Sequence, residues 1–212
     1  MQINIKNIVK TKQLKKIFII FLFFISSFHS LTKADDIRDL EIQGISVGDN
    51  ALDHFSKKKL DDNKAFYPKS KKVWRTAVLS NNEQYDLIQM HIKSSGNNYK
   101  ILSIAGILDF DNRNKGEEEC LNKRDEIVNN LKLILPNTPV SEEEINKHDG
   151  DIWGKSYEYS IFFDFKDDYS EYIKIGCTIT SDEYLKNENQ GHYLRLSLTT
   201  SEYHYWLKNE AY

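Results

Sequence analysis

The positions of two cysteines, Cys120 and Cys177, constrain the fold of this chain more than any other feature. Cys120 lies on the apolar stripe of residues 116–135, where Leu, Ile and Val recur at the period of an amphipathic helix. Cys177 lies in residues 171–180, where isoleucines at alternate positions share its side of a strand. Both cysteines therefore face the apolar interior, and we expect that helix to pack on that face of the sheet.

Residues 1–34 have the three parts of a secretory signal peptide. Six lysines and no acidic residue occur here, residues 17–28 are almost entirely apolar, and Thr32 and Ala34 place small residues before a cleavage site. The apolar run is shorter than the ~20 residues that span a bilayer. We therefore expect cleavage after Ala34, no stable membrane insertion afterwards, and a periplasmic or secreted domain at 35–212. An uncleaved N-terminal anchor is the alternative.

Export bears directly on the two cysteines. A pair of cysteines in an oxidising compartment is typical of a disulfide, so the sequence predicts a Cys120–Cys177 bond. Two buried free thiols are the alternative. We expect a structural bond, because a redox enzyme more often carries Cys-x-x-Cys, which is not present in this chain.

The charge of the exported part narrows the classes of partner. Residues 35–212 contain 23 basic and 32 acidic residues, a net charge of −9. Nucleic acids and anionic membrane surfaces would be repelled by that charge, so we expect neither as a partner. The 178 residues that remain suit one domain with a substantial core.

Apolar periodicity predicts an antiparallel sheet of about six strands. They occupy residues 72–79, 84–93, 99–110, 156–165, 171–180 and 192–199, with a short additional strand at 40–45. Short links rich in Asn and Gly follow the first two and predict hairpins. The third is apolar on both sides, which is typical of a central strand.

Helices complete the expected fold. A closing helix begins near Ser201, and Asp49 and Ser56 are expected to cap two short helical turns. We therefore expect one α+β domain, with helices packed on one face of the sheet, preceded by the signal peptide. Two small stacked lobes are the alternative.

Gly44-Ile-Ser-Val-Gly48 matches the G-x-S-x-G pattern of a nucleophile elbow. That elbow requires a sheet already built upstream, whereas few residues of the exported domain precede Gly44, so we interpret the motif as a turn. The overlapping Val47–Asn50 resembles the Gly-Asp-Ser block of a lipase/esterase family. However, Asn50 occupies the nucleophile position and no Asp-x-x-His follows near the C-terminus, which excludes acyl transfer.

Asp109, Asp111 and Asn112 form the best candidate metal site, because Ca²⁺ prefers several oxygen ligands on one loop. The spacing departs from an EF-hand, since Asn114 stands where that loop needs glycine. The alternative is a helix N-terminus whose first-turn glutamates complement the helix dipole. No other cofactor is predicted.

The histidines of the exported part show no zinc-binding spacing, so a zinc site would need ligands from distant segments. They are His54, His91, His148, His192 and His204. His148-Asp-Gly-Asp151 is a loop cluster that could hold a metal, and a solvated turn is the interpretation we prefer. Tyr203, Tyr205 and Trp206 could stack on sugars, although such a helix side more often packs on a sheet.

Three segments, 35–56, 120–128 and 203–212, resemble those of a group of small exported proteins from marine alphaproteobacteria. That group has no assigned activity, so the resemblance implies export and supplies no mechanism. More loosely, the strand–turn–helix around Gly44 and Gly48 is similar to the start of envelope domains of the β-lactamase-inhibitor-protein type, which bind other proteins. This chain lacks their lipid-attachment cysteine and the Gly-x-Pro that often closes their first helix.

We therefore expect an exported binding or accessory protein without catalytic activity, which presents a sheet face or a loop to an envelope protein partner. The alternative is an envelope hydrolase or metal-dependent enzyme whose site is assembled from distant segments. A third hypothesis is the carriage of a small ligand between the sheet and a helix.

Overall fold

The computed structural model describes residues 36–80, 84–94, 99–110, 116–188 and 190–212. The predicted signal peptide lies outside these residues, as do Asp111 and Asn112 of the candidate calcium site. Among the helices of the described residues, none has both the length and the hydropathy needed to cross a membrane.

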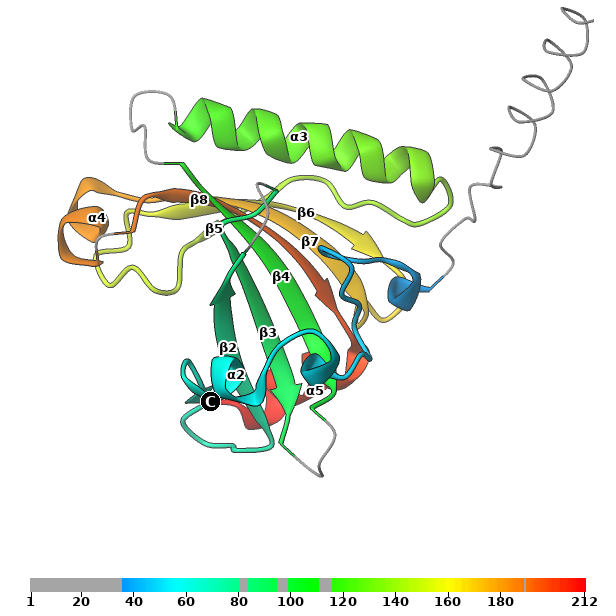
Figure 1. Cartoon of the computed structure of the whole chain (residues 1–212). Coiled ribbons are helices and arrows are strands. Elements are labelled where there is room, and N and C mark those ends of the chain that lie inside the picture. The colour runs from blue at the N-terminus through cyan, green and yellow to red at the C-terminus, as the bar shows by residue number, and fades with distance from the viewer. Residues whose placement is uncertain (1–35, 81–83, 95–98, 111–115, 189) are drawn as a thin grey trace, which may run out of the picture. The chain divides into compact units, whose positions relative to one another are not determined.

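Eight antiparallel strands form one sheet in the described part of the chain, in the order β1-β2-β3-β4-β8-β7-β6-β5 (Figure 1). They are β1 (Ala65–Phe66), β2 (Val73–Leu79), β3 (Leu87–Lys93), β4 (Ile101–Phe110), β5 (Glu144–Lys147), β6 (Tyr157–Asp164), β7 (Tyr172–Ile179) and β8 (His192–Thr199). β4 pairs with β8 from Ser103↔Thr199 to Phe110↔His192 and joins the two halves. The sheet is continuous, so the alternative of two stacked lobes is wrong.

The expected number of about six strands is also wrong, although all six predicted strands are present. The two additional strands are the edges of the sheet. β1 has two residues, and β5 reads Glu-Ile-Asn-Lys with all four residues exposed. Neither offers an apolar alternation from which a strand could be predicted.

The strand predicted at 40–45 is instead a tight turn. Only an isolated bridge joins Ile42 to Ile45, and Gln43 and Gly44 have φ of 55° and 74°. Glycine adopts such a left-handed backbone easily, whereas a strand cannot contain it. The alternating apolar residues of this segment therefore enter the core from a turn.

The described residues also form four α-helices and two short 3₁₀ helices. They are α2 (Lys57–Asp61), α3 (Gly116–Ile134), α4 (Asp182–Glu188), α5 (Ser201–Glu210), η1 (Ile37–Asp39) and η2 (Ala51–Asp53). Ser56 caps α2, as expected. The cap of η2 is Asn50 rather than Asp49, because the Asn50 side chain accepts the backbone N–H of Leu52.

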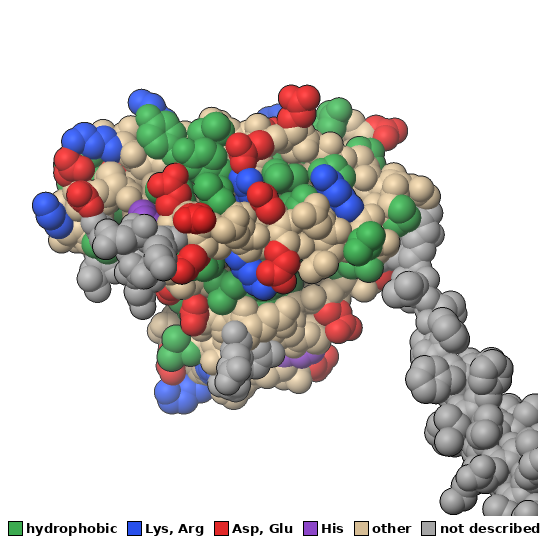
Figure 2. Space-filling model, turned by 90° about the horizontal axis from the view of Figure 1, so that it is seen from above, with side chains coloured by type: hydrophobic (Ala, Val, Ile, Leu, Met, Phe, Trp, Pro, Cys, Tyr) green, Lys and Arg blue, Asp and Glu red, His purple; other side chains and the backbone are tan. Residues whose placement is uncertain are grey.

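Helix α3 lies over β4, β7 and β8 and covers one face of the sheet, here called the helix face (Figure 1). Val128 on its inner side and Leu135 directly after its last residue share a core cluster with Ile104, Phe163 and Ile173 of the sheet. Figure 2 looks down on α3 and shows acidic and basic side chains interspersed on its outer surface. The helix is therefore amphipathic in the way the sequence indicates.

The N-terminal segment completes this core beside α3. Ile37, Ile42 and Leu60 are at most 2% exposed and join the same cluster. The Thr76 hydroxyl on β2 donates to the carbonyl of Leu60 at 2.9 Å, which fixes α2 against the sheet.

Helix α5 packs on the opposite side of the sheet, so the expectation of helices on one face is wrong. Its Tyr203 and Trp206 are buried in a second cluster with Val73 and Leu102. Tyr203 also stacks on His91 of β3, with the ring centroids 4.4 Å apart. The prediction that the aromatic side of this helix packs on the sheet is therefore confirmed for Tyr203 and Trp206, whereas Tyr205 is 49% exposed.

The sheet face opposite α3 is called the open face below. α5 covers one end of it. Side chains that alternate with those of the core point to this face from β2, β3, β7 and β8. They include Arg75, Gln89, His91, Lys174, Tyr193 and Arg195.

Candidate functional site

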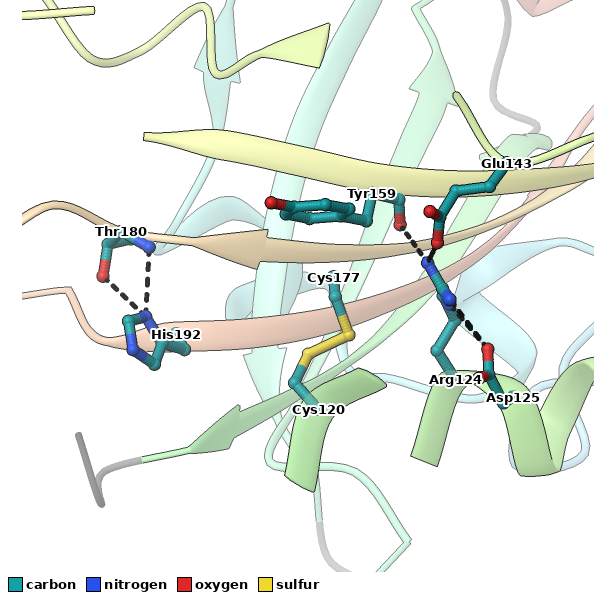
Figure 3. Close-up of a disulfide and its surroundings, with 8 residues drawn as sticks. All are labelled: Cys120, Arg124, Asp125, Glu143, Tyr159, Cys177, Thr180 and His192. Atoms are coloured by element: carbon teal, nitrogen blue, oxygen red, sulfur yellow. Dashed lines mark hydrogen bonds and ion pairs between the residues drawn. A yellow bond between two sulfur atoms is a disulfide. The ribbon is translucent and has the colours of Figure 1, made fainter. Parts of the chain in front are cut away.

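Cys120 and Cys177 join α3 to β7 (Figure 3). Their Cα atoms lie 5.9 Å apart, and both residues are fully buried. Leu194 of β8 shares their small apolar cluster. The predicted pairing is therefore present in the structure. A buried disulfide is typical of proteins outside the reducing cytoplasm.

Arg124 lies one helical turn after Cys120 and is also buried, at 5% exposure. Its guanidinium donates to the carboxylates of Asp125 and Glu143 and to the carbonyl of Tyr159 (Figure 3). The charge of this buried arginine is thus paired with two carboxylates. The contact ties α3 to the segment that leads into β5.

The described residues include only one of the three predicted calcium ligands. Asp109 is exposed near the end of β4, where its backbone N–H donates to the Asp86 carboxylate at 2.8 Å. The other two predicted ligands lie outside the described residues. In the described part of the chain, no group of three or more His, Cys, Asp or Glu side chains could hold a metal ion.

The G-x-S-x-G motif is a structural turn. Ser46 is 8% exposed, and its hydroxyl donates to the carbonyl of Leu40 at 2.6 Å. His54 contacts the Asp49 carboxylate at 3.2 Å, and that same oxygen accepts the Ser46 backbone N–H at 2.9 Å. Among the described residues, the Ser46 hydroxyl therefore donates to a backbone carbonyl and not to a base, which agrees with the interpretation of the motif as a turn.

A more distinctive arrangement lies in the loop between β5 and β6. The 148–156 loop, as it is called here, closes with a hydrogen bond from the His148 N–H to the Ser156 carbonyl at 2.9 Å. Two consecutive turns fill it. The backbone N–H of Asp151 donates to the backbone carbonyl of His148, and the backbone N–H of Gly154 donates to the backbone carbonyl of Asp151. Gly154 has a φ of 66°, which glycine adopts without strain.

The Asp151 carboxylate is the centre of this loop. One carboxylate oxygen accepts the backbone N–H of Trp153 at 2.9 Å. The other accepts the N–H groups of Lys155 and Ser156 at 3.1 and 2.7 Å, and the Ser156 hydroxyl at 2.6 Å. It also lies 3.3 Å from the Ser181 hydroxyl, which caps the start of α4. A carboxylate that accepts this many donors fixes the loop in one conformation.

The charged form of Asp151 is strongly favoured. Burial alone would raise its pKa, but the hydrogen bonds from Ser156, Trp153 and Lys155 outweigh burial and lower the pKa to about 2. Asp151 is only 6% exposed. The preferred sequence interpretation, a solvated turn around His148–Asp151, is therefore wrong for Asp151.

Helix α4 and strand β8 hold the loop from outside. Lys155 pairs with Glu183 of α4 at 2.5 Å, and the Ser181 N–H donates to the Ser156 hydroxyl at 2.9 Å. The His148 ring makes T-shaped contacts with Tyr184 of α4 and Tyr193 of β8, with ring centroids 5.4 and 6.3 Å apart. The loop is thus braced on two sides.

This braced loop exposes apolar side chains. Ile152 is 85% exposed and Trp153 is 39% exposed. On the same β5–β6 hairpin, Ile145 and Tyr157 are 57% and 39% exposed. Single exposed apolar residues are ordinary, but four on one hairpin are a local concentration.

These four residues were not predicted to form a binding site. The sequence does carry a local signal, because Ile152 and Trp153 are adjacent apolar residues in the mostly polar segment 137–154. Whether these side chains are held on a fixed loop depends on Ser181. It lies thirty residues from Asp151 in sequence and contacts it only in the folded protein.

Comparison with known proteins adds no further constraint. No model of a protein family matches the chain, and no curated protein matches it. The geometry of the 148–156 loop and of the open face is therefore the basis for assigning a function.

Proposed function

We propose that the domain is a periplasmic or secreted binding module without catalytic activity, which docks on a partner protein through the 148–156 loop. The observation that carries this proposal is a rigid loop that exposes Ile152 and Trp153. A loop already fixed by Asp151 loses little conformational entropy on binding, which favours affinity.

The chemistry of the loop favours a protein with an apolar recess as its occupant. Tryptophan is enriched among the residues that dominate protein interfaces, and a neighbouring aliphatic side chain enlarges the buried surface. An anionic membrane is disfavoured because residues 35–212 carry a net charge of −9. The free edge of β5, which in the described residues pairs only with β6, adds backbone groups beside the loop.

The disulfide supports the proposed periplasmic or secreted location. Both sulfur atoms are inaccessible between α3 and β7, and such bonds persist in oxidising compartments. The envelope or the extracellular medium is where the signal-like segment at 1–34 would deliver the chain.

A capture experiment with matched variants tests the proposal. The purified protein and its Ile152→Ser, Trp153→Ala and Leu133→Ser variants are used as baits in an envelope extract, followed by mass spectrometry. Leu133 on α3 is 80% exposed, so its variant removes a comparable apolar side chain from another surface. We expect one protein to be enriched by the wild type and by Leu133→Ser, and lost with both loop variants.

Binding of the captured protein is then measured with purified components. Trp153→Ala should raise the Kd by about 30-fold or more, the size expected for an interface hot spot. Equal capture by all four baits would contradict the proposal. Binding to lipid vesicles that disappears in the loop variants would also contradict it, in favour of a membrane-docking loop.

A further inference from the structure

The described residues contain four arginines, and two of them lack a carboxylate partner. Arg38 pairs with Asp36 at 2.8 Å, and Arg124 pairs with Asp125 and Glu143. Within the described ranges, no carboxylate oxygen lies within 4.0 Å of Arg75 or Arg195. In an acidic domain, two arginines without an acid are unexpected.

The fold brings these two arginines to one place on the open face. Arg75 on β2 is the direct partner of His91 on β3. Arg195 on β8 reaches across β4, and its Nη1 donates to Oε1 of Gln89 on β3 at 3.2 Å. Ala105, the β4 partner of Gln89, is small enough to leave this path clear. Both arginines therefore converge on the Gln89–His91 pair.

Hydrogen-bonding rules fix the protonation of this cluster. A guanidinium can only donate, so the side-chain oxygen of Gln89 faces Arg195 and its NH₂ group faces His91. That NH₂ group lies 3.3 Å from Nε2 of His91, so Nε2 is the acceptor. The proton of the neutral imidazole is then on Nδ1.

His91 remains neutral in this position. Its side chain is 3% exposed, and burial, together with the charges of Arg195 and Arg75, holds its pKa well below the usual range. The Nδ1 atom is buried and, among the described residues, has no hydrogen-bond partner. A buried N–H donor without an acceptor destabilises a fold, so its presence beside two guanidinium groups calls for an explanation.

Every unmet polar group in this cluster is therefore a donor. Arg75 offers its whole guanidinium and Arg195 offers the N–H groups not used by Gln89, while the Nδ1–H of His91 is a further donor buried beneath them. Arg75 is exposed and Arg195 is half-buried, so a ligand can reach both from solvent.

We propose that Arg75 and Arg195 bind an oxyanion group, a carboxylate or a phosphate, of a small ligand on the open face. The planar fork of arginine matches the oxygens of either group and binds them with two parallel hydrogen bonds. Gln89 holds Arg195 in place and is a positioning residue. This site is distinct from the 148–156 loop and does not depend on the function proposed for it.

The test is a titration of the purified protein with two probes, inorganic phosphate and citrate, followed by calorimetry and by NMR of the arginine side chains. We expect at least one probe to bind, and Arg75→Ala and Arg195→Ala each to weaken that binding about tenfold, which corresponds to roughly 1.4 kcal/mol. Arg195→Lys should also weaken it, because lysine keeps the charge but lacks the fork. Binding of phosphate alone identifies a phosphate ligand, and binding of citrate alone identifies a carboxylate.

Arg38→Ala is the control, because it removes the same charge from a site where arginine already has acidic partners. It should leave the affinity unchanged. The proposal is overturned if neither probe binds at about 10 mM, a concentration that detects even weak binding. It is also overturned if Arg38→Ala weakens binding as much as the two site variants, because the effect would then be one of net charge.

Discussion

The hydroxyl of Ser156 donates to the Asp151 carboxylate at 2.6 Å and accepts the backbone N–H of Ser181 at 2.9 Å. This single side chain thus links the centre of the 148–156 loop to the start of α4. The contact explains how a hairpin loop with two exposed apolar residues is held in one conformation rather than collapsing onto the sheet.

The first prediction concerns Asp151→Asn, which retains the shape of the side chain but replaces one acceptor oxygen by a donor NH₂. The donors of Trp153, Lys155 and Ser156 then compete for one oxygen, so the loop should open more often. Amide hydrogen exchange at these positions should accelerate about tenfold or more, while exchange in α3 stays unchanged. Unchanged exchange in the loop would show that Asp151 does not rigidify it.

The second prediction is a pH dependence. The pKa of Asp151 is lowered to about 2 in the folded protein, against an ordinary value of 3.8. A group whose pKa is lower in the folded state stabilises it above the unfolded-state pKa and loses that contribution as the pH falls towards the folded-state pKa. Stability from this group should therefore be complete above about pH 5 and decline between about pH 4 and pH 2.

Urea unfolding of the wild type and of Asp151→Asn between pH 7 and pH 2 measures this effect. The difference in unfolding free energy should be constant near neutral pH and should shrink in acid. Asp168, whose pKa is also lowered to about 2 by the hydroxyls of Ser170 and Tyr205, contributes equally to both proteins and cancels. A difference that does not change with pH would refute the charged role of Asp151.

Much of the fold could be predicted because its main elements carry their own periodicity. The stripe of α3 and the alternation in β7 indicate which sides are buried, and from those sides the Cys120–Cys177 contact follows. β5 could not be predicted, because only one of its four residues is apolar and its extended form depends on pairing with β6.

The sites depend even more on long-range order. Arg75 and Arg195 are separated by most of the domain, and only the order β2-β3-β4-β8 brings them near His91. Each looks like a surface arginine in the sequence. For the same reason, the lack of a carboxylate partner can be recognised only once the sheet is assembled.

The third prediction concerns the disulfide. The bond closes a segment with a sequence separation of 57 residues, which in the chain-entropy model stabilises the fold by about 4 kcal/mol. Urea unfolding with and without reductant should show a loss of this size. A Cys120→Ala/Cys177→Ala variant should resemble the reduced protein and become insensitive to reductant. Equal stability of the oxidised and reduced wild type would contradict a structural role.

The fourth prediction concerns Gly106 in β4, over which the Tyr85 ring lies. A Cβ at this position would come within 2.6 Å of two carbons of that ring, and Tyr85 is 5% exposed in the main core, so the ring has little room to move. Gly106→Ala should lower the unfolding free energy by about 1–3 kcal/mol, the usual cost of overpacking a core. Gly191→Ala is the matched control, because its nearest contact is an ordinary 3.5 Å. In the Tyr85→Leu background, Gly106→Ala should lower the unfolding free energy by less than in the wild type, since the ring that clashes is gone. An equal loss in both backgrounds would show that the cost arises elsewhere.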